Sequence, residues 1–160
     1  MVGPTHKEPV IPGPVLFAYD GSELAQFAIE QAARELTPGR AAFALCVWQP
    51  ADVGFIPVDH QHFDAQDAAQ VQQAAEQVAA HGAALAEQAG FRPQSLTIKA
   101  APTWKGIVEA AHDHHATLIV LGTHHRTGII GHLQGSVTAA VISHTTISVL
   151  VVHQQTVDTP

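Results

Sequence analysis

The fold is decided by the stretch LIVLGTHHRTGIIGHLQGSVT, residues 118–138. It opens on four consecutive apolar residues, Leu118 to Leu121, a short run that is typical of a strand buried on both faces. A glycine-rich segment follows, and Ser136 then precedes a helical pattern that starts at Val137. The order of strand, glycine-rich loop and helix is that of one β-α unit in a parallel sheet.

The same alternation continues through the rest of the chain. Short apolar runs predict five strands, at residues 15–19, 41–47, 95–99, 118–121 and 148–152. Between them, apolar residues at helical spacing predict four helices, around 24–36, 65–89, 107–111 and 137–144, with Thr103 as the expected N-cap of the third. This order predicts an α/β domain, a three-layer, doubly wound, five-stranded parallel sheet of Rossmann-like type.

Residues 15–153 are expected to form one domain. Residues 1–14 contain four prolines and no periodic apolar face, so they are expected to form a flexible N-terminal arm, and residues 154–160 a short C-terminal tail. Ligands of doubly wound sheets bind outside the carboxyl ends of the strands. The loops that follow the first, second and fourth strands are therefore the candidate site.

The composition narrows the possible partners. The chain has 160 residues with a net charge of −7, and only seven lysines and arginines. Such a balance argues against nucleic acid or an anionic membrane as the main partner. No apolar run approaches the roughly 20 residues that span a bilayer, and the start of the chain has no apolar signal segment. One cysteine, Cys46, forms no internal disulfide, so a reducing, cytoplasmic location is expected.

The glycine-rich loop has the chemistry of an anion site. The helix expected to start near Ser136 offers unpaired N–H groups, and phosphate is a common ligand of such helix ends. Ser136 and Thr138 carry hydroxyls in its first turn, and Arg126 is the one cation of the loop. The loop lacks the lysine of a Walker A motif, so binding without fast hydrolysis is expected.

Several motifs together resemble the universal stress protein family over about residues 15–152. The resemblance rests on Val15–Ser22 with its Asp-Gly-Ser turn, Leu45-Cys46-Val47, Leu118–His124, Arg126–Gly128, Gly135–Thr138 and Ser148–Val152. It implies the adenine nucleotide alpha hydrolase-like variant of the Rossmann-like fold. The ATP-binding branch of that family carries Gly-x2-Gly-x9-Gly-Ser/Thr. Gly122, Gly135 and Ser136 fill three places of this motif, and His125 replaces its second glycine. The imidazole there either crowds the phosphates or donates a hydrogen bond to them.

The resemblance also implies roles for particular residues. Ala18 and Asp20 would lie beside the nucleoside, with Asp20 facing the ribose or a phosphate-bound Mg²⁺. Val47 would lie against the adenine. The ribose and phosphates would be lined by Leu121, Gly122, Thr123 and His124, and the phosphates cradled by Gly135, Ser136, Val137 and Thr138, beside His125 and Arg126.

The resemblance implies a homodimer joined through the last strand, Ser148–Val152, and a stress-response module that is regulatory or protective. Two alternatives stay open. One is a stress-protein-like interaction module that binds no nucleotide because His125 blocks the phosphate path. The other is an enzyme, a slow ATPase or a self-phosphorylating protein, with Ser136 or Thr138 as acceptor. The missing lysine makes catalysis the weaker reading.

Overall fold

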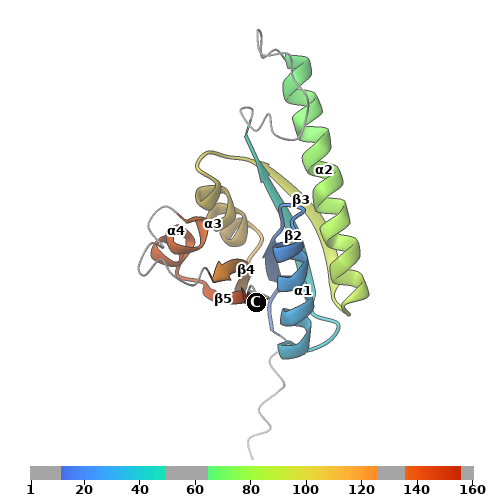
Figure 1. Ribbon diagram of the computed structural model, residues 1–160, viewed down its shortest axis with the longest axis vertical. Coiled ribbons are helices and arrows are strands. Elements are labelled where there is room, and N and C mark those ends of the chain that lie inside the picture. The colour runs from blue at the N-terminus through green and yellow to red at the C-terminus, as the bar shows by residue number, and fades with distance from the viewer. Residues whose placement is uncertain (1–11, 50–64, 126–135, 156–160) are drawn as a thin grey trace, which may run out of the picture.

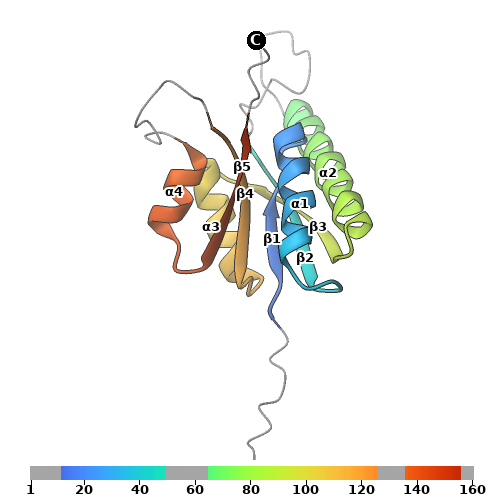
Figure 2. The ribbon, with the colours of Figure 1, turned by 60° about the horizontal axis from the view of Figure 1, so that its bottom comes forward.

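The computed structural model describes residues 12–49, 65–125 and 136–155. Along the chain the elements are β1 (Val15–Ala18), α1 (Glu23–Glu35), β2 (Ala41–Trp48), α2 (Ala65–Gln88), β3 (Arg92–Lys99), α3 (Thr103–Asp113), β4 (Leu118–His125), α4 (Val137–His144) and β5 (Ser148–Gln155). The strands form one sheet in the order β3-β2-β1-β4-β5, and every pairing is parallel. Helices α1 and α2 cover one face of this sheet, and α3 and α4 cover the other (Figures 1 and 2). The predicted three-layer α/β fold is confirmed.

Local sequence explains where the helices begin. Ser22 caps α1, because its hydroxyl oxygen accepts a hydrogen bond from the backbone N–H of Ala25 at 3.1 Å. Ser136 caps α4 in the same way, with the N–H of Ala139 as donor at 3.1 Å. The predicted cap of α3 is wrong: Pro102 occupies the N-cap position, and Thr103 is the first residue of the helix.

Strands β4 and β5 are longer than their apolar runs. β4 continues from Leu121 through His125, and β5 continues through Gln155, because residues 118–125 pair in register with residues 148–155. Hydrogen bonds to a neighbouring strand stabilise polar residues that periodicity alone assigns to a loop. His125 therefore has the extended backbone of a strand and pairs with Gln155, so the chain needs no left-handed glycine at this position.

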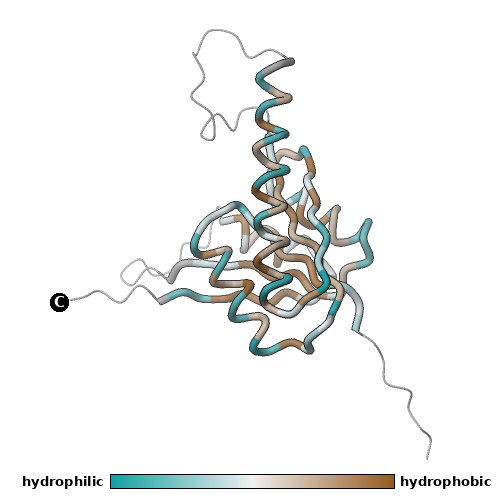
Figure 3. The backbone as a smooth tube through the Cα atoms, turned by 90° about the vertical axis from the view of Figure 1, so that its right-hand side faces the viewer, coloured by the Kyte–Doolittle hydropathy of each residue, from teal (hydrophilic) through white to brown (hydrophobic). Residues whose placement is uncertain are grey.

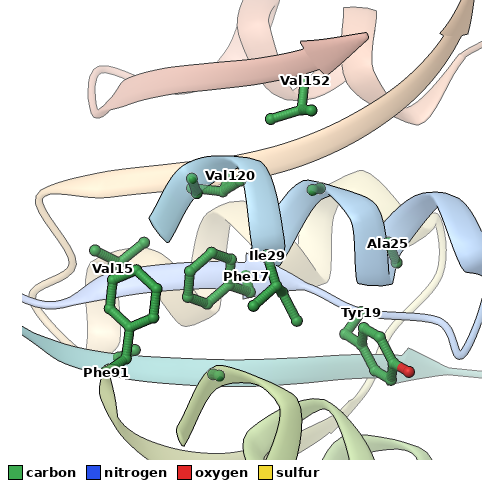
Figure 4. Close-up of a cluster of buried hydrophobic side chains, with 12 residues drawn as sticks. Val15, Phe17, Tyr19, Ala25, Ile29, Phe91, Val120 and Val152 are labelled. Carbon is green, nitrogen blue, oxygen red and sulfur yellow. The ribbon is translucent and has the colours of Figure 1, made fainter. Parts of the chain in front are cut away.

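A hydrophobic core lies on each face of the sheet. On the face of α1 and α2, Val15, Phe17 and Tyr19 follow one another along β1 and its exit, as Figure 4 shows. The Phe17 ring packs edge-on against Phe91, with centroids 5.1 Å apart. On the opposite face, Leu16 and Leu45 pack with buried residues of α3 and α4. Figure 3 shows hydrophobic strands at the centre and α2 with alternating polar and apolar residues.

The end of the N-terminal segment is attached to the sheet. The carbonyl of Gly13 accepts a hydrogen bond from Nε of Arg40 at 2.7 Å, and the carbonyl of Pro14 accepts one from the N–H of Thr117 at 2.9 Å. The rest of the predicted arm, and the tail beyond Gln155, lie outside the described residues. Among the helices described here, none is long and apolar enough to cross a membrane.

Candidate functional site

A cavity of about 160 Å³ lies where the carboxyl ends of β1, β2 and β4 meet the starts of α1, α3 and α4. This is the sheet edge at which the sequence predicts a site. The lining includes seven of the residues predicted for the site, which are Ala18, Asp20, Val47, Leu121, Gly122, Val137 and Thr138. They come from three strand ends and the start of α4, so the fold brings together residues up to 120 positions apart in the chain.

Other predicted residues lie elsewhere or outside the described part. Thr123 is half-buried in β4 but does not line the cavity, and Ser136 caps α4 at its margin. The backbones of His124 and His125 belong to β4, where they pair with β5. Arg126 and Gly135 lie outside the described residues.

The structure adds cavity residues that the sequence analysis missed, which are Tyr19, Ser22, Leu24, Ala25, Leu45, Thr103 and Ile107. Five of the seven belong to the N-cap or the N-terminal half of α1 and α3. Their common signal is topological: in a parallel β-α sheet, the helix after each strand starts near the strand's carboxyl end. Thr103 begins α3 at this predicted edge and lines the cavity.

Position 122 requires glycine for a packing reason that the sequence motif does not reveal. A Cβ at this position would lie 2.8 Å from Cγ of Leu24 and 2.9 Å from the Leu24 carbonyl oxygen. Contacts this short, one of them with backbone, would force α1 away from β4. Close packing of α1 against the sheet thus requires glycine here, independently of any ligand.

Polar groups at the β1 exit form a tight turn. Oδ1 of Asp20 accepts a hydrogen bond from the N–H of Ser22 at 3.0 Å, and Gly21 has a φ of 84°, which glycine adopts without strain. The same turn delivers Ser22 to its position as N-cap of α1. Asp20-Gly21-Ser22 is therefore a capping turn for α1. The turn also places the exposed Asp20 carboxyl group at the cavity.

Thr138 is the buried polar residue on the other side of the cavity. It is 7% exposed and lines the cavity from the first turn of α4. Within the described part of the chain, its hydroxyl makes no hydrogen bond. A hydroxyl without a protein partner is available to donate a hydrogen bond to a ligand or to water in the cavity. The first turn of α4, with Val137 and Thr138 in the lining, therefore brings this hydroxyl and the backbone N–H groups of a helix start to the cavity.

Tyr19 joins the cavity to α2. Its ring is buried, and burial, with a smaller contribution from the negative charge of Asp20, raises the pKa of the Tyr19 hydroxyl. The group is therefore protonated at neutral pH. It lies 2.8 Å from Nδ1 of His81 on α2.

The described residues contain no cluster of three histidine, cysteine or acidic side chains that would hold a metal by themselves. Asp20 is one carboxylate at the cavity. Mg²⁺ commonly binds through one or two carboxylates together with substrate phosphates and water. Any magnesium held at this edge would thus require a phosphorylated ligand.

Together, the sheet and the cavity define a doubly wound α/β domain with a mostly apolar ligand cavity at the carboxyl edge. The chain matches the Universal stress protein family over residues 13–153. Because this match covers most of the sequence, the chain belongs to the universal stress protein family.

Solved structures share the fold at low sequence identity. The hypothetical protein MJ0577 superimposes with a TM-score of 0.70 at 23% identity, covering 92% of this chain and 99% of that one. A universal stress protein in complex with cAMP gives 0.61 at 20% identity, with 89% and 98% covered. A family protein from Arabidopsis thaliana with AMP bound gives 0.63 at 15%, with 93% and 96% covered. No curated protein matches the chain.

Proposed function

We propose that this protein binds ATP, together with Mg²⁺, in the cavity at the carboxyl edge of its sheet. The observation that carries the proposal is Thr138, a nine-tenths buried residue that lines the cavity and whose hydroxyl makes no hydrogen bond with the described residues. It stands in the first turn of α4, where backbone N–H groups and the helix dipole favour a phosphate.

The rest of the cavity fits the other parts of a nucleotide. Leu45, Val47 and Ile107 form an apolar wall suited to the flat face of a base. Asp20, on the adjoining turn, would accept hydrogen bonds from a ribose or hold a phosphate-bound magnesium ion. The volume of about 160 Å³ is below the roughly 300–1,000 Å³ of ligand pockets. We infer that the base and ribose enter it and that the phosphates extend over the start of α4.

The fold relatives support an adenine nucleotide in particular. One is a universal stress protein in complex with cAMP, and another has AMP bound. Among the described residues, no lysine or arginine lines the cavity. The loop before α4 also lacks the lysine of a Walker A motif, a cation of the kind that stabilises charge in phosphoryl transfer, so we propose binding rather than turnover. In this proposal the protein acts in the cytoplasm as a stress-response module, and the bound nucleotide favours one of its conformations.

The test is isothermal titration of metal-stripped protein with ATP, with and without Mg²⁺. The key variant is Thr138→Val, which keeps the shape of the side chain and removes its hydroxyl. A hydrogen bond to a charged group contributes about 1.5–3 kcal/mol, so the dissociation constant should rise roughly 10- to 100-fold.

Thr146→Val provides the matched control, because Thr146 is exposed and lies at the opposite end of α4, between that helix and β5. It should leave the affinity unchanged. The proposal fails if the wild-type protein shows neither binding heat nor a shift in melting temperature with ATP. Parallel titrations with AMP, cAMP and GTP would establish which phosphates and which base the cavity accepts.

We also propose that two copies associate through β5. This strand is the last in the sheet, and its apolar residues Val149, Leu150 and Val151 are only half-buried. An apolar edge strand is stabilised when another strand covers it. Sedimentation should therefore show a dimer that Val151→Lys converts to monomer. The matched change Ile142→Lys, at an exposed apolar residue of α4, should preserve the dimer. A monomeric wild-type protein would contradict this assembly.

A further inference from the structure

The turn that contains Asp20 is next to a residue, Tyr19, that contacts helix α2, and α2 has no residue in the lining of the cavity. α2 lies on the opposite face of the sheet from α3 and α4, as Figure 2 shows, and none of its residues lines the cavity. Its side chain His81 nevertheless has Nδ1 2.8 Å from the hydroxyl of Tyr19, and the two rings are 5.9 Å apart. The residue after β1 is thus tied to a helix 62 positions away in sequence.

The backbone of α2 also comes unusually close to this turn. A Cβ at Gly82 would lie 2.6 Å from Cδ1 and 2.8 Å from Cγ of Tyr19, so the bare glycine forms the surface on which the ring rests. One helical turn earlier, Val78 lies 3.6 Å from the position of a Cβ on Gly21. α2 therefore contacts the residue before Asp20 and lies near the residue after it.

Tyr19 contacts both the cavity and α2. Figure 4 shows it beyond Phe17 in the row of side chains along β1, with its hydroxyl at the end of the row. The residue lines the cavity while its hydroxyl reaches α2. The backbone N–H of Tyr19 donates to the carbonyl of Leu45 at 2.8 Å, which fixes the start of the turn to β2.

By contrast, Asp20, Gly21 and Ser22 are exposed. Local hydrogen bonds alone leave an exposed turn several conformations, and a ligand must then select one of them at a cost in affinity. A rigid contact next to the carboxylate reduces that cost. The hydrogen bond of 2.8 Å between the Tyr19 hydroxyl and Nδ1 of His81 supplies such a contact next to Asp20.

We propose that Tyr19 is a positioning residue that, through its contacts with His81 and Gly82, fixes the Asp20 carboxylate at the nucleotide cavity and couples occupancy of that cavity to α2. This inference rests on the proposed function, because it concerns the same cavity. Coupling is reciprocal: if α2 stabilises the bound turn, the bound nucleotide stabilises the packing of α2. The long helix is then the surface through which occupancy changes the outside of the molecule.

The experiment measures ATP dissociation constants for Tyr19→Phe, His81→Ala and the double variant. Tyr19→Phe removes only the hydroxyl, and each single change should weaken binding roughly 3- to 10-fold, the range of one hydrogen bond. The double variant should be no weaker than either single variant, because both remove the same contact. His81→Asn, which keeps a polar atom near the position of Nδ1, should restore most of the affinity.

The same change made in an Asp20→Asn protein distinguishes a positioning role of Tyr19 from a general loss of structure. In a protein that already carries Asp20→Asn, Tyr19→Phe should change the dissociation constant less than twofold, because the charge that it orients is gone. Hydrogen exchange adds a direct readout: saturating ATP should slow exchange in α2 of the wild-type protein and should not do so in Tyr19→Phe. His112→Ala, at an exposed histidine of α3, is the matched control and should behave as wild type.

The outcomes distinguish the two proposals. A wild-type protein that binds no ATP overturns the proposed function, and the positioning role falls with it. If the wild type binds and Tyr19→Phe stays within twofold of it, or if the two single effects add, nucleotide binding stands and the positioning role is overturned. Because His81 is exposed, His81→Ala tests the contact even if Tyr19→Phe proves poorly folded.

Discussion

The two helical layers cover the sheet to different extents. α1 and α2, with 13 and 24 residues, form a continuous layer over one face, whereas α3 and α4 have 11 and 8 residues (Figure 2). On the first face, buried side chains follow β1 from Val15 as far as Tyr19. On the second face, the core residues Leu45, Ile107 and Leu121 also line the cavity, which lies where α3 and α4 start.

This difference suggests that the α1 and α2 layer serves mainly the stability of the fold and that the α3 and α4 layer serves mainly ligand binding. Buried apolar area is the main source of folding free energy, and the first layer buries side chains along the whole of β1. The other layer leaves helix starts, with their unpaired N–H groups, around a space between strand ends. Tyr19 lies at the boundary, since it belongs to the first core and also lines the cavity. The following predictions test this division.

The largest effect is expected in the core between the sheet and α1. Phe17 is 1% exposed and packs against Phe91, so Phe17→Ala should lower the free energy of unfolding by about 3–5 kcal/mol. Urea denaturation followed by circular dichroism would measure the change. Ile142→Ala is the control on α4, where the side chain is 49% exposed, and it should change stability by less than about 0.5 kcal/mol.

Equal losses from Phe17→Ala and Ile142→Ala would contradict the division between the two layers. They would mean that α4 buries an apolar surface in the protein in solution. Sedimentation of the same samples would then show whether a second copy covers that surface.

Smaller effects are expected at the two serine caps, which are alike in geometry but lie on opposite layers. Each hydroxyl accepts from a backbone N–H at 3.1 Å, so Ser22→Ala and Ser136→Ala should each cost about 1 kcal/mol of stability. Their effects on ATP affinity should differ: Ser136→Ala should weaken binding more, because α4 is the helix proposed to meet the phosphates. Thermal denaturation and titration of both variants measure the two quantities.

If Ser22→Ala weakened ATP binding as much as Ser136→Ala at equal stability loss, the phosphates would not be specific to α4. The helix start of α1, which also borders the cavity, would then share that role.

Much of the fold could be predicted from the sequence because its signals are local. Each signal acts within a few residues of the chain. The signals are the apolar run Leu118–Leu121, the apolar residues every four positions from Leu24 to Leu36, and the serines before two helices. The strand ends were predicted less well: polar residues through His125 remain in β4 because β5 pairs with them. No pattern within β4 itself reveals that pairing.

The candidate site could be predicted in part for the same reason. The rule for the carboxyl edge, with the family resemblance, pointed to Asp20, Val47 and Thr138, all of which line the cavity. It missed Thr103 and Ile107, because the motif quoted for the family contains no residue of α3.

The sequence by itself determined the order of strands and helices, the parallel sheet and the edge at which a ligand would bind, because periodicity and capping act between near neighbours. Only the tertiary structure decided which side chains meet there. Leu24 makes glycine necessary at position 122, and His81 reaches Tyr19 across 62 residues. These contacts depend on how closely helices approach the sheet, and that distance follows from the packing of all the layers together.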